Sequence, residues 1–339
     1  MQSAITYANA DTHHDMTRLV EKIRIQSGNS SLNLAYCDII SVPDEIFQLT
    51  NLKSLDLSHN QLTFIPESLG QLYRLQKLDL THNQLKAVPT NLRQLRSLRY
   101  LWLDHNQLSS IPDSLWLRRL RVLNLSHNQL TVVPNIPGQL RKLRCLRLDY
   151  NQLLAVPDSL GQLTSLSDLH LDHNQLTSVP DSLGQLTSLR ELHLNNNQLT
   201  FVPDSLGQLI KLHSLFLHDN QLVSIPDSLG QLINLMELYL NHNQLTFVPD
   251  SLGQLTKLHS LFLHDNQLVS IPDSLGELPS IRIYLNNNTL SYIPVSLRRL
   301  RYIDDIGLDF IRRHEIMIDG KSIHELYDDL LHSLNLPFK

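Results

Sequence analysis

The sequence repeats itself with a period of 23 residues. The segment KLHSLFLHDNQLVSIPDSLG occurs unchanged at Lys211–Gly230 and at Lys257–Gly276. Between these copies and on both sides of them, asparagine returns at intervals of 23 residues, with two intervals of 22: Asn60, Asn83, Asn106, Asn128, Asn151, Asn174, Asn197, Asn220, Asn243, Asn266 and Asn288. A unit this short cannot bury a core by itself, so the period predicts a stack of similar units that share one core.

The pattern inside each unit predicts a short strand. Leu261 and Leu263 alternate with Phe262, which places the leucines on one face and Phe262 on the other. Parallel stacking at about 4.8 Å would join these strands into the inner wall of a curved solenoid. The amide of each asparagine has donors and an acceptor that can tie one turn to the next unit. The proline that follows ends the strand, and D-S-L-G-Q-L is short enough for an irregular or 3₁₀ segment on the convex side.

The full repeat reads L-x-x-L-x-L-x-x-N-x-L followed by I/V-P-x-S-L-G-x-L, with Cys37 at the first asparagine position. This resembles the leucine-rich repeat family, with short bacterial-type repeats, over about residues 31–311. The resemblance implies an α/β solenoid: a horseshoe with a concave parallel sheet of about 13 strands, forming one structural domain. The thirteenth strand, before Ile311, is expected to be degenerate.

Two narrower resemblances concern function. The start of the array, with Leu32-Asn33-Leu34 and the segment Ile40–Ile46, is similar to the repeat region of Roco proteins, but no G-x-x-x-x-G-K-[ST] nucleotide-binding loop is present. An array without an attached catalytic domain also looks like the stand-alone leucine-rich repeat effectors of intracellular bacteria.

Helical caps are expected at both ends, because terminal repeats otherwise expose leucine core to water. Residues 1–30 are predicted to form an N-terminal cap with a helix over Asp11–Gln26. Residues 312–339 are predicted to form a C-terminal cap and tail, in which Ser322 and Glu325 make a capping box for a helix that ends near Leu334.

Composition predicts the cellular compartment of the protein. Only two cysteines are present, which favours a reducing compartment, and the chain starts without a cationic segment leading into an apolar run. No stretch approaches the roughly 18 apolar residues of a membrane span. The expected location is the cytoplasm, or the cytosol of a host cell reached without a secretory signal peptide.

The outward residues at the centre of the strands are the main candidate binding site. Four successive aromatic residues end this series, and exposed neighbouring aromatics usually mark a binding surface, although stacked rings can also stabilise a sheet. We predict that a protein partner contacts this wall through Tyr100, Trp102, Arg147, His170, His193, Phe216, Tyr239, Phe262 and Tyr284.

Charge is uneven along the array. Residues 51–150 contain 14 basic and 6 acidic residues, whereas residues 151–300 contain 6 basic and 13 acidic residues. The basic half repeats arginine seven and ten residues before the asparagine, as two ladders: Arg99, Arg121 and Arg144, and Arg96, Arg118 and Arg141. A solvated edge is the favoured interpretation. The alternatives are an anion-binding edge for phosphate or an acidic partner, and nucleic acid, which the acidic half disfavours.

No catalytic motif emerges from the sequence, so the predicted function is a non-enzymatic protein-binding scaffold without a cofactor or metal ion. One alternative is zinc at His170 and His193, which are flanked by Asp168, Asp172 and Glu191. Another is an enzyme that uses these histidines or the thiol of Cys145.

Overall fold

The computed structural model describes residues 19–21, 23–25, 28–138, 140–291, 294, 296–297, 317–318 and 321–322. The chain groups into two compact units, the first from Met1 to Gln152 and the second from Leu153 to Lys339. Each unit is described by itself, and the expected single domain stays a prediction.

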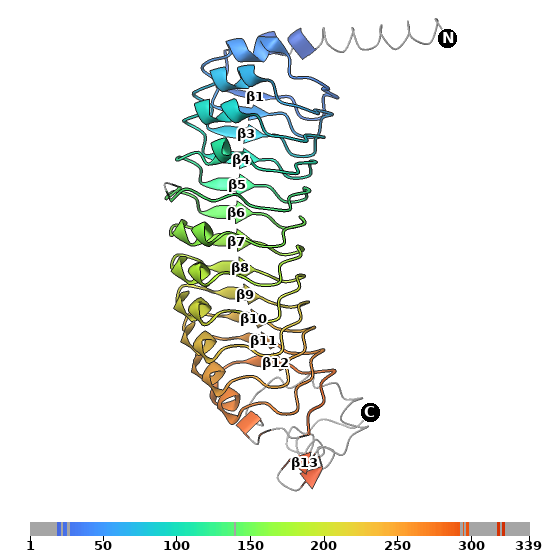
Figure 1. Cartoon of the computed structure of the whole chain (residues 1–339), viewed down its shortest axis with the longest axis vertical. Helices are drawn as coiled ribbons and strands as arrows, with labels where there is room; N and C mark the ends of the chain where they lie inside the picture. The colour runs from blue at the N-terminus through green and yellow to red at the C-terminus, as the bar shows by residue number, and fades with distance from the viewer. Residues whose placement is uncertain are drawn as a thin grey trace, which may run out of the picture. The chain divides into compact units, whose positions relative to one another are not determined.

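The described part of the first unit contains six parallel strands, each hydrogen-bonded to the next in sequence order (Figure 1). They are β1 (Ser31–Asn33), β2 (Ser54–Asp56), β3 (Lys77–Asp79), β4 (Tyr100–Trp102), β5 (Val122–Asn124) and β6 (Cys145–Arg147). Four 3₁₀ helices lie between strands: η1 (Asp44–Gln48), η2 (Glu67–Gln71), η3 (Thr90–Gln94) and η4 (Asp113–Leu115). The register advances by one repeat, so that Leu55 is paired with Leu78.

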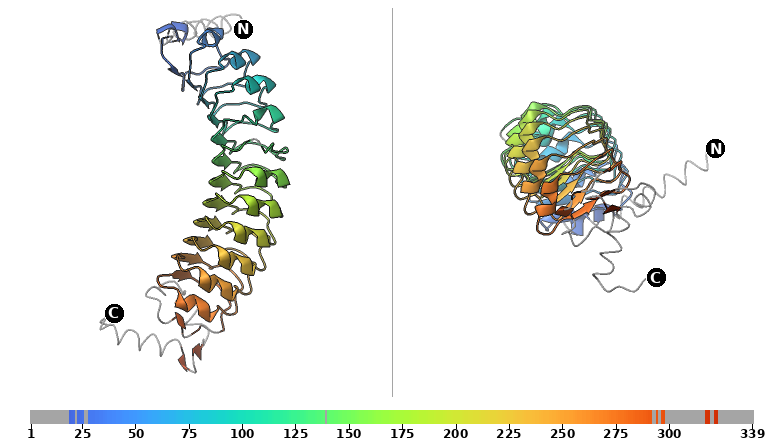
Figure 2. Two further views of the ribbon diagram at one scale, coloured as in Figure 1. Left: turned by 90° about the vertical axis from the view of Figure 1, so that its left-hand side faces the viewer. Right: turned by 90° about the horizontal axis from the view of Figure 1, so that it is seen from below.

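The second unit repeats this plan. Its parallel strands are β7 (Asp168–His170), β8 (Glu191–His193), β9 (Ser214–Phe216), β10 (Glu237–Tyr239), β11 (Ser260–Phe262) and β12 (Arg282–Tyr284). Its 3₁₀ helices are η5 (Asp158–Gln162), η6 (Asp181–Gln185), η7 (Asp204–Gln208), η8 (Asp227–Gln231), η9 (Asp250–Gln254) and η10 (Asp273–Glu277). In each unit the strands follow one side and the 3₁₀ helices another (Figure 2).

Leucine fills the core of both units. In β11, Leu261 is fully buried while Ser260 and Phe262 on either side are partly exposed, as the alternation predicts. Leucines of the 3₁₀ helices are also buried, including Leu229 in η8 and Leu252 in η9. The fold class predicted from the sequence, a leucine-rich repeat solenoid with parallel strands, is therefore confirmed. We call the outward side of the strands the sheet face.

Each asparagine of the repeat joins consecutive turns, as predicted. The Nδ2 group of Asn197 donates to the carbonyl oxygens of Leu171 and Leu194 at 3.0 Å and to that of Asn195 at 3.2 Å. Its Oδ1 atom accepts a hydrogen bond from the backbone N–H of Leu176 at 3.0 Å. Because one side chain satisfies backbone groups of two repeats, the asparagine column locks the stack at every turn.

Proline and glycine of the repeat explain why the segments after the strands form 3₁₀ helices. Pro203 precedes η7 in an extended conformation, and its carbonyl accepts the N–H of Leu206 at 3.1 Å. Glycine is required where successive helices touch, because a Cβ atom on Gly184 would collide with the backbone oxygen of Ser205 in the next repeat.

The predicted caps fall mostly on residues outside the described part. At the front, Leu19–Glu21 and Ile23–Ile25 are helical, in agreement with the N-terminal helix, and Leu19 and Ile23 are buried. At the back, Ser322 ends β14 (Lys321–Ser322), which pairs antiparallel with β13 (Met317–Ile318). The thirteenth strand of the array, residue Glu325 and the C-terminal helix lie outside the described residues.

None of the described helices is long and apolar enough to cross a membrane.

Candidate protein-binding surface

Six rings form a continuous stack on the sheet face of the second unit. We call this the aromatic stripe; it consists of His170, His193, Phe216, Tyr239, Phe262 and Tyr284. Each residue ends one strand and faces the equivalent residue of the next, as in the pairing of Tyr239 with Phe262. Neighbouring ring centroids lie 4.1 to 4.7 Å apart, and the planes differ by 3° to 18°. The structure therefore brings together six of the nine residues predicted to bind a partner.

Stacking changes what the stripe offers to a partner. All six residues are half-buried, because each inner ring has a neighbour against both of its faces. Burial is the main cause that raises the pKa of Tyr239, followed by the nearby carboxylate of Glu237. The sequence predicted open aromatic side chains, whereas the surface left for contact consists of ring edges and the tyrosine hydroxyl groups.

Acidic groups border the stripe at the first residue of several strands. This position is occupied by Asp168 in β7, Glu191 in β8 and Glu237 in β10. Among the described parallel strands of the second unit, β12 alone has a basic residue there, Arg282. The hydroxyl of Ser214 donates to a carboxylate oxygen of Glu237 at 3.4 Å. An apolar stripe beside carboxylates favours a partner that combines apolar and basic side chains.

The other three predicted contact residues lie on the first unit. Tyr100 and Trp102 are both half-buried in β4, with ring centroids 5.8 Å apart. Lys77 lies 5.6 Å from the Tyr100 ring centroid, within the range of a cation–π contact. Arg147 ends β6 and is exposed. The strands of this unit end at Asn33, Asp56, Asp79, Trp102, Asn124 and Arg147, so polar and charged groups predominate at these positions of its sheet face.

A second ring stack in the first unit was missed by the sequence analysis. We call it the histidine ladder; it consists of Tyr36, His59, His82, His105, His127 and Tyr150. The centroids are 4.0 to 4.2 Å apart. All six residues have positive φ angles of 50° to 55°, which turn them outward just before the buried asparagine or, for Tyr36, before Cys37. Four histidines at one position of a regular stack were the available signal.

The histidine ladder lies among groups with shifted pKa values. Burial and the neighbouring imidazoles lower the pKa of His82 and His105. Burial also raises the pKa of the Asp104 carboxyl to about 6. Asp104 lies one residue before His105 and accepts a hydrogen bond from Asn124 Nδ2 at 2.8 Å. Protonation of His82, His105 and Asp104 is therefore coupled to folding.

Asp104→Asn is expected to raise the melting temperature at pH 7.5 and to change it little at pH 4. The carboxyl has a higher pKa in the folded chain than in the unfolded chain. Its contribution to folding stability is therefore fully present below the unfolded-state pKa and is lost as pH rises through about 6. The amide remains neutral and keeps an acceptor for Asn124. Melting curves from pH 4 to pH 8 measure the difference, with exposed Asp113→Asn as control. A gain that is the same at every pH would contradict this assignment.

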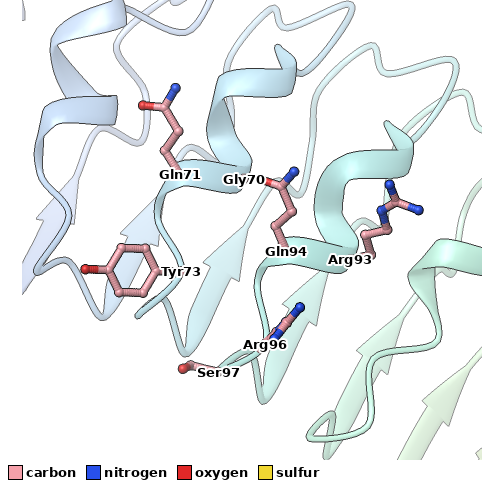
Figure 3. Close-up of a pocket in the computed structure, with 7 residues that line it drawn as sticks. All are labelled: Gly70, Gln71, Tyr73, Arg93, Gln94, Arg96 and Ser97. Carbon is pink, nitrogen blue, oxygen red and sulfur yellow. The ribbon is translucent and has the colours of Figure 1, made fainter.

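One of the two predicted arginine ladders, Arg99, Arg121 and Arg144, is joined through its backbone in consecutive repeats of the first unit. Arg121 N–H donates to the Arg99 carbonyl at 2.7 Å, and Arg144 N–H donates to the Arg121 carbonyl at 2.8 Å. Arg99 is half-buried and the other five predicted arginines are exposed: Arg96, Arg118, Arg121, Arg141 and Arg144. Arg96 borders a surface hollow with Tyr73 and Arg93, between the η2 and η3 repeats (Figure 3).

The stacked histidines of the stripe are poorly arranged for the zinc site considered from the sequence. Ligand atoms of His170, Glu191 and His193 lie within 4.8 Å of one another. However, the two imidazoles are stacked 4.1 Å apart with planes only 15° from parallel. Because a metal ion must lie close to both ring planes, parallel rings cannot both direct a lone pair at one ion without rotating.

An exposed apolar row on the second unit was also missed. It consists of Phe201, Val223, Phe247 and Val269, each between 51% and 53% exposed. Phe201 and Phe247 come four residues after the repeat asparagine, whereas Val223 and Val269 come three residues after it. Because the offset from the repeat asparagine alternates between four and three residues, these four residues do not share one position of the repeat.

Comparison with protein families agrees with the repeat geometry. A model of a leucine-rich repeat region matches residues 78–200 and 180–322, and a second leucine rich repeat model matches residues 30–85. These matches cover well over half of the chain, and neither model describes an enzyme. No match was found among curated proteins.

Three solved structures illustrate the similarity. A leucine-rich repeat protein of Leptospira interrogans has 27% identity and a TM-score of 0.58 over 88% of this chain and 98% of that chain. An internalin of Listeria monocytogenes has 24% identity and a TM-score of 0.72 over 85% and 93%, which shows the fold alone. A plant peptide hormone receptor in complex with RGF2 has 28% identity and a TM-score of 0.63 over 78% of this chain and 48% of the receptor chain.

Proposed function

The chain belongs to the leucine-rich repeat family, and from this premise we propose that it binds a protein partner through the aromatic stripe. The observation that carries the proposal is the continuous stack of six half-buried rings on the sheet face of the second unit. The leucine-rich repeat fold is a typical protein-interaction scaffold. Within this fold, the stripe is a rigid surface whose rings already restrict one another before a partner arrives.

The size of the stripe suits a single partner element. Six strands at about 4.8 Å spacing place the first and last rings roughly 24 Å apart. An extended segment of about seven residues spans that distance. The described part of the second unit between residues 153 and 291 contains 4 basic and 13 acidic residues. We therefore favour a partner segment that carries apolar side chains for the ring edges and basic side chains for the bordering carboxylates.

A finer hypothesis is that the partner belongs to a host cell which the protein reaches after leaving a bacterium. Its support is the short bacterial-type repeat and the similarity to the repeat protein of Leptospira interrogans. The alternative binding surface is the arginine ladders, where no carboxylate of the described residues lies within ion-pair distance of the six guanidinium groups. This surface would bind an anion or an acidic partner.

Photo-cross-linking at three positions tests these proposals. Benzoylphenylalanine replaces Phe262 in the stripe, Arg121 in an arginine ladder, or exposed Gln208 at the end of η7. Each protein is irradiated in a bacterial lysate and in an animal-cell lysate. We expect a defined protein adduct from position 262 in the animal-cell lysate. An adduct from position 121 alone would support the arginine ladders instead, and an adduct from position 208 alone would contradict sheet-face binding. Adducts confined to the bacterial lysate would contradict the host hypothesis.

A further inference from the structure

We propose that His242, His264 and Asp265 bind one divalent transition-metal ion of the zinc class. The three residues lie just beyond the ends of β10 and β11, in adjacent repeats of the second unit. One ligand atom from each lies within 4.8 Å of the others. Two imidazoles and a carboxylate are a ligand set that zinc and its neighbours accept, with the fourth position left to water.

The two imidazoles have the relative orientation that a shared ion needs. Their centroids are 5.5 Å apart and their planes are at 84°. Zinc–nitrogen bonds of about 2.05 Å at a tetrahedral angle place two imidazole centres about 5.2 Å apart. The same bond lengths set ligand atoms roughly 3.3 Å apart. His242 Nε2 and Asp265 Oδ2 are 3.5 Å apart, so two of the three ligand atoms already have nearly this spacing.

Backbone and side-chain hydrogen bonds hold the three residues in place. The N–H of His242 donates to the carbonyl oxygen of His264 at 3.1 Å, which fixes the two repeats relative to each other. Asn287 Nδ2 donates to Asp265 Oδ1 at 2.8 Å, so the other carboxylate oxygen is oriented toward His242. Such an outer hydrogen bond typically orients a ligand and supports metal affinity. The His242 side chain is 50% exposed, which leaves an ion a path from solvent.

The duplicated repeats supply a natural comparison. His218 and Asp219 occupy the same places in the first copy as His264 and Asp265 in the second. The ring of His218 lies 6.3 Å from Phe216 at 75°, and that of His264 lies 6.3 Å from Phe262 at 78°, so both copies hold histidine in the same orientation. The repeat before the first copy has Asn196 where the repeat before the second has His242. The repeat after each copy differs as well, because Asn287 follows the second copy where His242 follows the first. His242 and Asn287 thus distinguish the complete site from its incomplete twin.

Zinc titration of the full-length chain, followed by isothermal calorimetry, tests the proposal with two reciprocal variants. His242→Asn replaces one of the three ligands by the residue that the twin has there and is expected to remove one equivalent of bound zinc. Asn196→His supplies the third ligand of the twin and is expected to add one equivalent that binds more weakly, since the twin has His242 in place of Asn287. Histidine is compatible with the backbone there, because Asn196 has a φ angle of 53° and His242 has one of 52°. Magnesium at the same concentration is expected to give no binding heat, since it prefers oxygen ligands.

Circular dichroism checks that both variants are folded, so that a change in the number of zinc ions bound reports on the site. Any zinc bound by the other histidines is the same in the wild-type chain and in both variants. Only the difference of one zinc equivalent therefore reports on this site. Unchanged zinc stoichiometry in His242→Asn would overturn the proposal, as would a wild-type chain that binds no zinc. Asn287→Ala is expected to weaken zinc about tenfold through loss of the carboxylate's orientation.

Discussion

Asn197→Ala is expected to lower the free energy of unfolding by about 1–3 kcal/mol. The side chain is only 9% exposed and makes four hydrogen bonds to backbone groups. Alanine leaves the buried N–H of Leu176 without this partner, whereas the carbonyl oxygens of Leu171, Leu194 and Asn195 each keep another donor. A buried polar group that loses its partner costs about 1–3 kcal/mol, so the unpaired N–H of Leu176 sets the size of the effect. Urea unfolding monitored by circular dichroism measures the change.

The preceding residue provides a matched control. Asn196 is also an asparagine, but it is half-buried, has a φ angle of 53° and faces outward. Asn196→Gly keeps a residue that tolerates this backbone conformation and is expected to change stability by less than about 1 kcal/mol. Equal losses from Asn196→Gly and Asn197→Ala would contradict the division of this turn into an inward and an outward asparagine.

The sequence predicts such inward positions well because translation by one repeat places equivalent residues on top of one another. Leu261 and Asn197 could be assigned from the repeat alone, since every copy must satisfy the same core and the same turn. The central residues of the aromatic stripe were located for the same reason. The period fixes which residues are neighbours, and parallel strands fix their spacing.

The orientation of the rings could not be predicted in this way. Whether Phe262 points freely outward or lies flat against Tyr239 depends on side-chain rotation, which the repeat pattern does not specify. The histidine ladder was missed because the repeat places residues such as His105 at one turn position without specifying how their rings are oriented. The orthogonal pair His242 and His264 was missed because the two histidines occupy different positions of consecutive repeats, and the repeat period relates only equivalent positions.

Tyr239→Ala is expected to weaken partner binding at least thirtyfold, because aromatic anchors near the centre of an interface commonly contribute 2 kcal/mol or more, and about 1.4 kcal/mol corresponds to a factor of ten. Tyr239 stacks on Phe216 at 4.7 Å and on Phe262 at 4.3 Å, so alanine also opens a gap in the aromatic stripe. Affinity is measured with the partner identified by cross-linking at position 262. Tyr239→Phe preserves the ring and separates the contribution of the hydroxyl from that of the stack.

Loss of stacking also lowers stability by about 1–3 kcal/mol for two ring contacts, so binding and folding must be separated. His105→Asn serves as the matched control, because it removes a ring stacked on two neighbours at 4.0 Å in the first unit, away from the stripe residues in the sequence. Asparagine tolerates the positive φ angle of 53° at this position. We expect His105→Asn to lower the melting temperature while leaving affinity unchanged. If Tyr239→Ala lowered only the melting temperature and its folded fraction bound with wild-type affinity, the aromatic stripe would be structural and the partner would bind elsewhere.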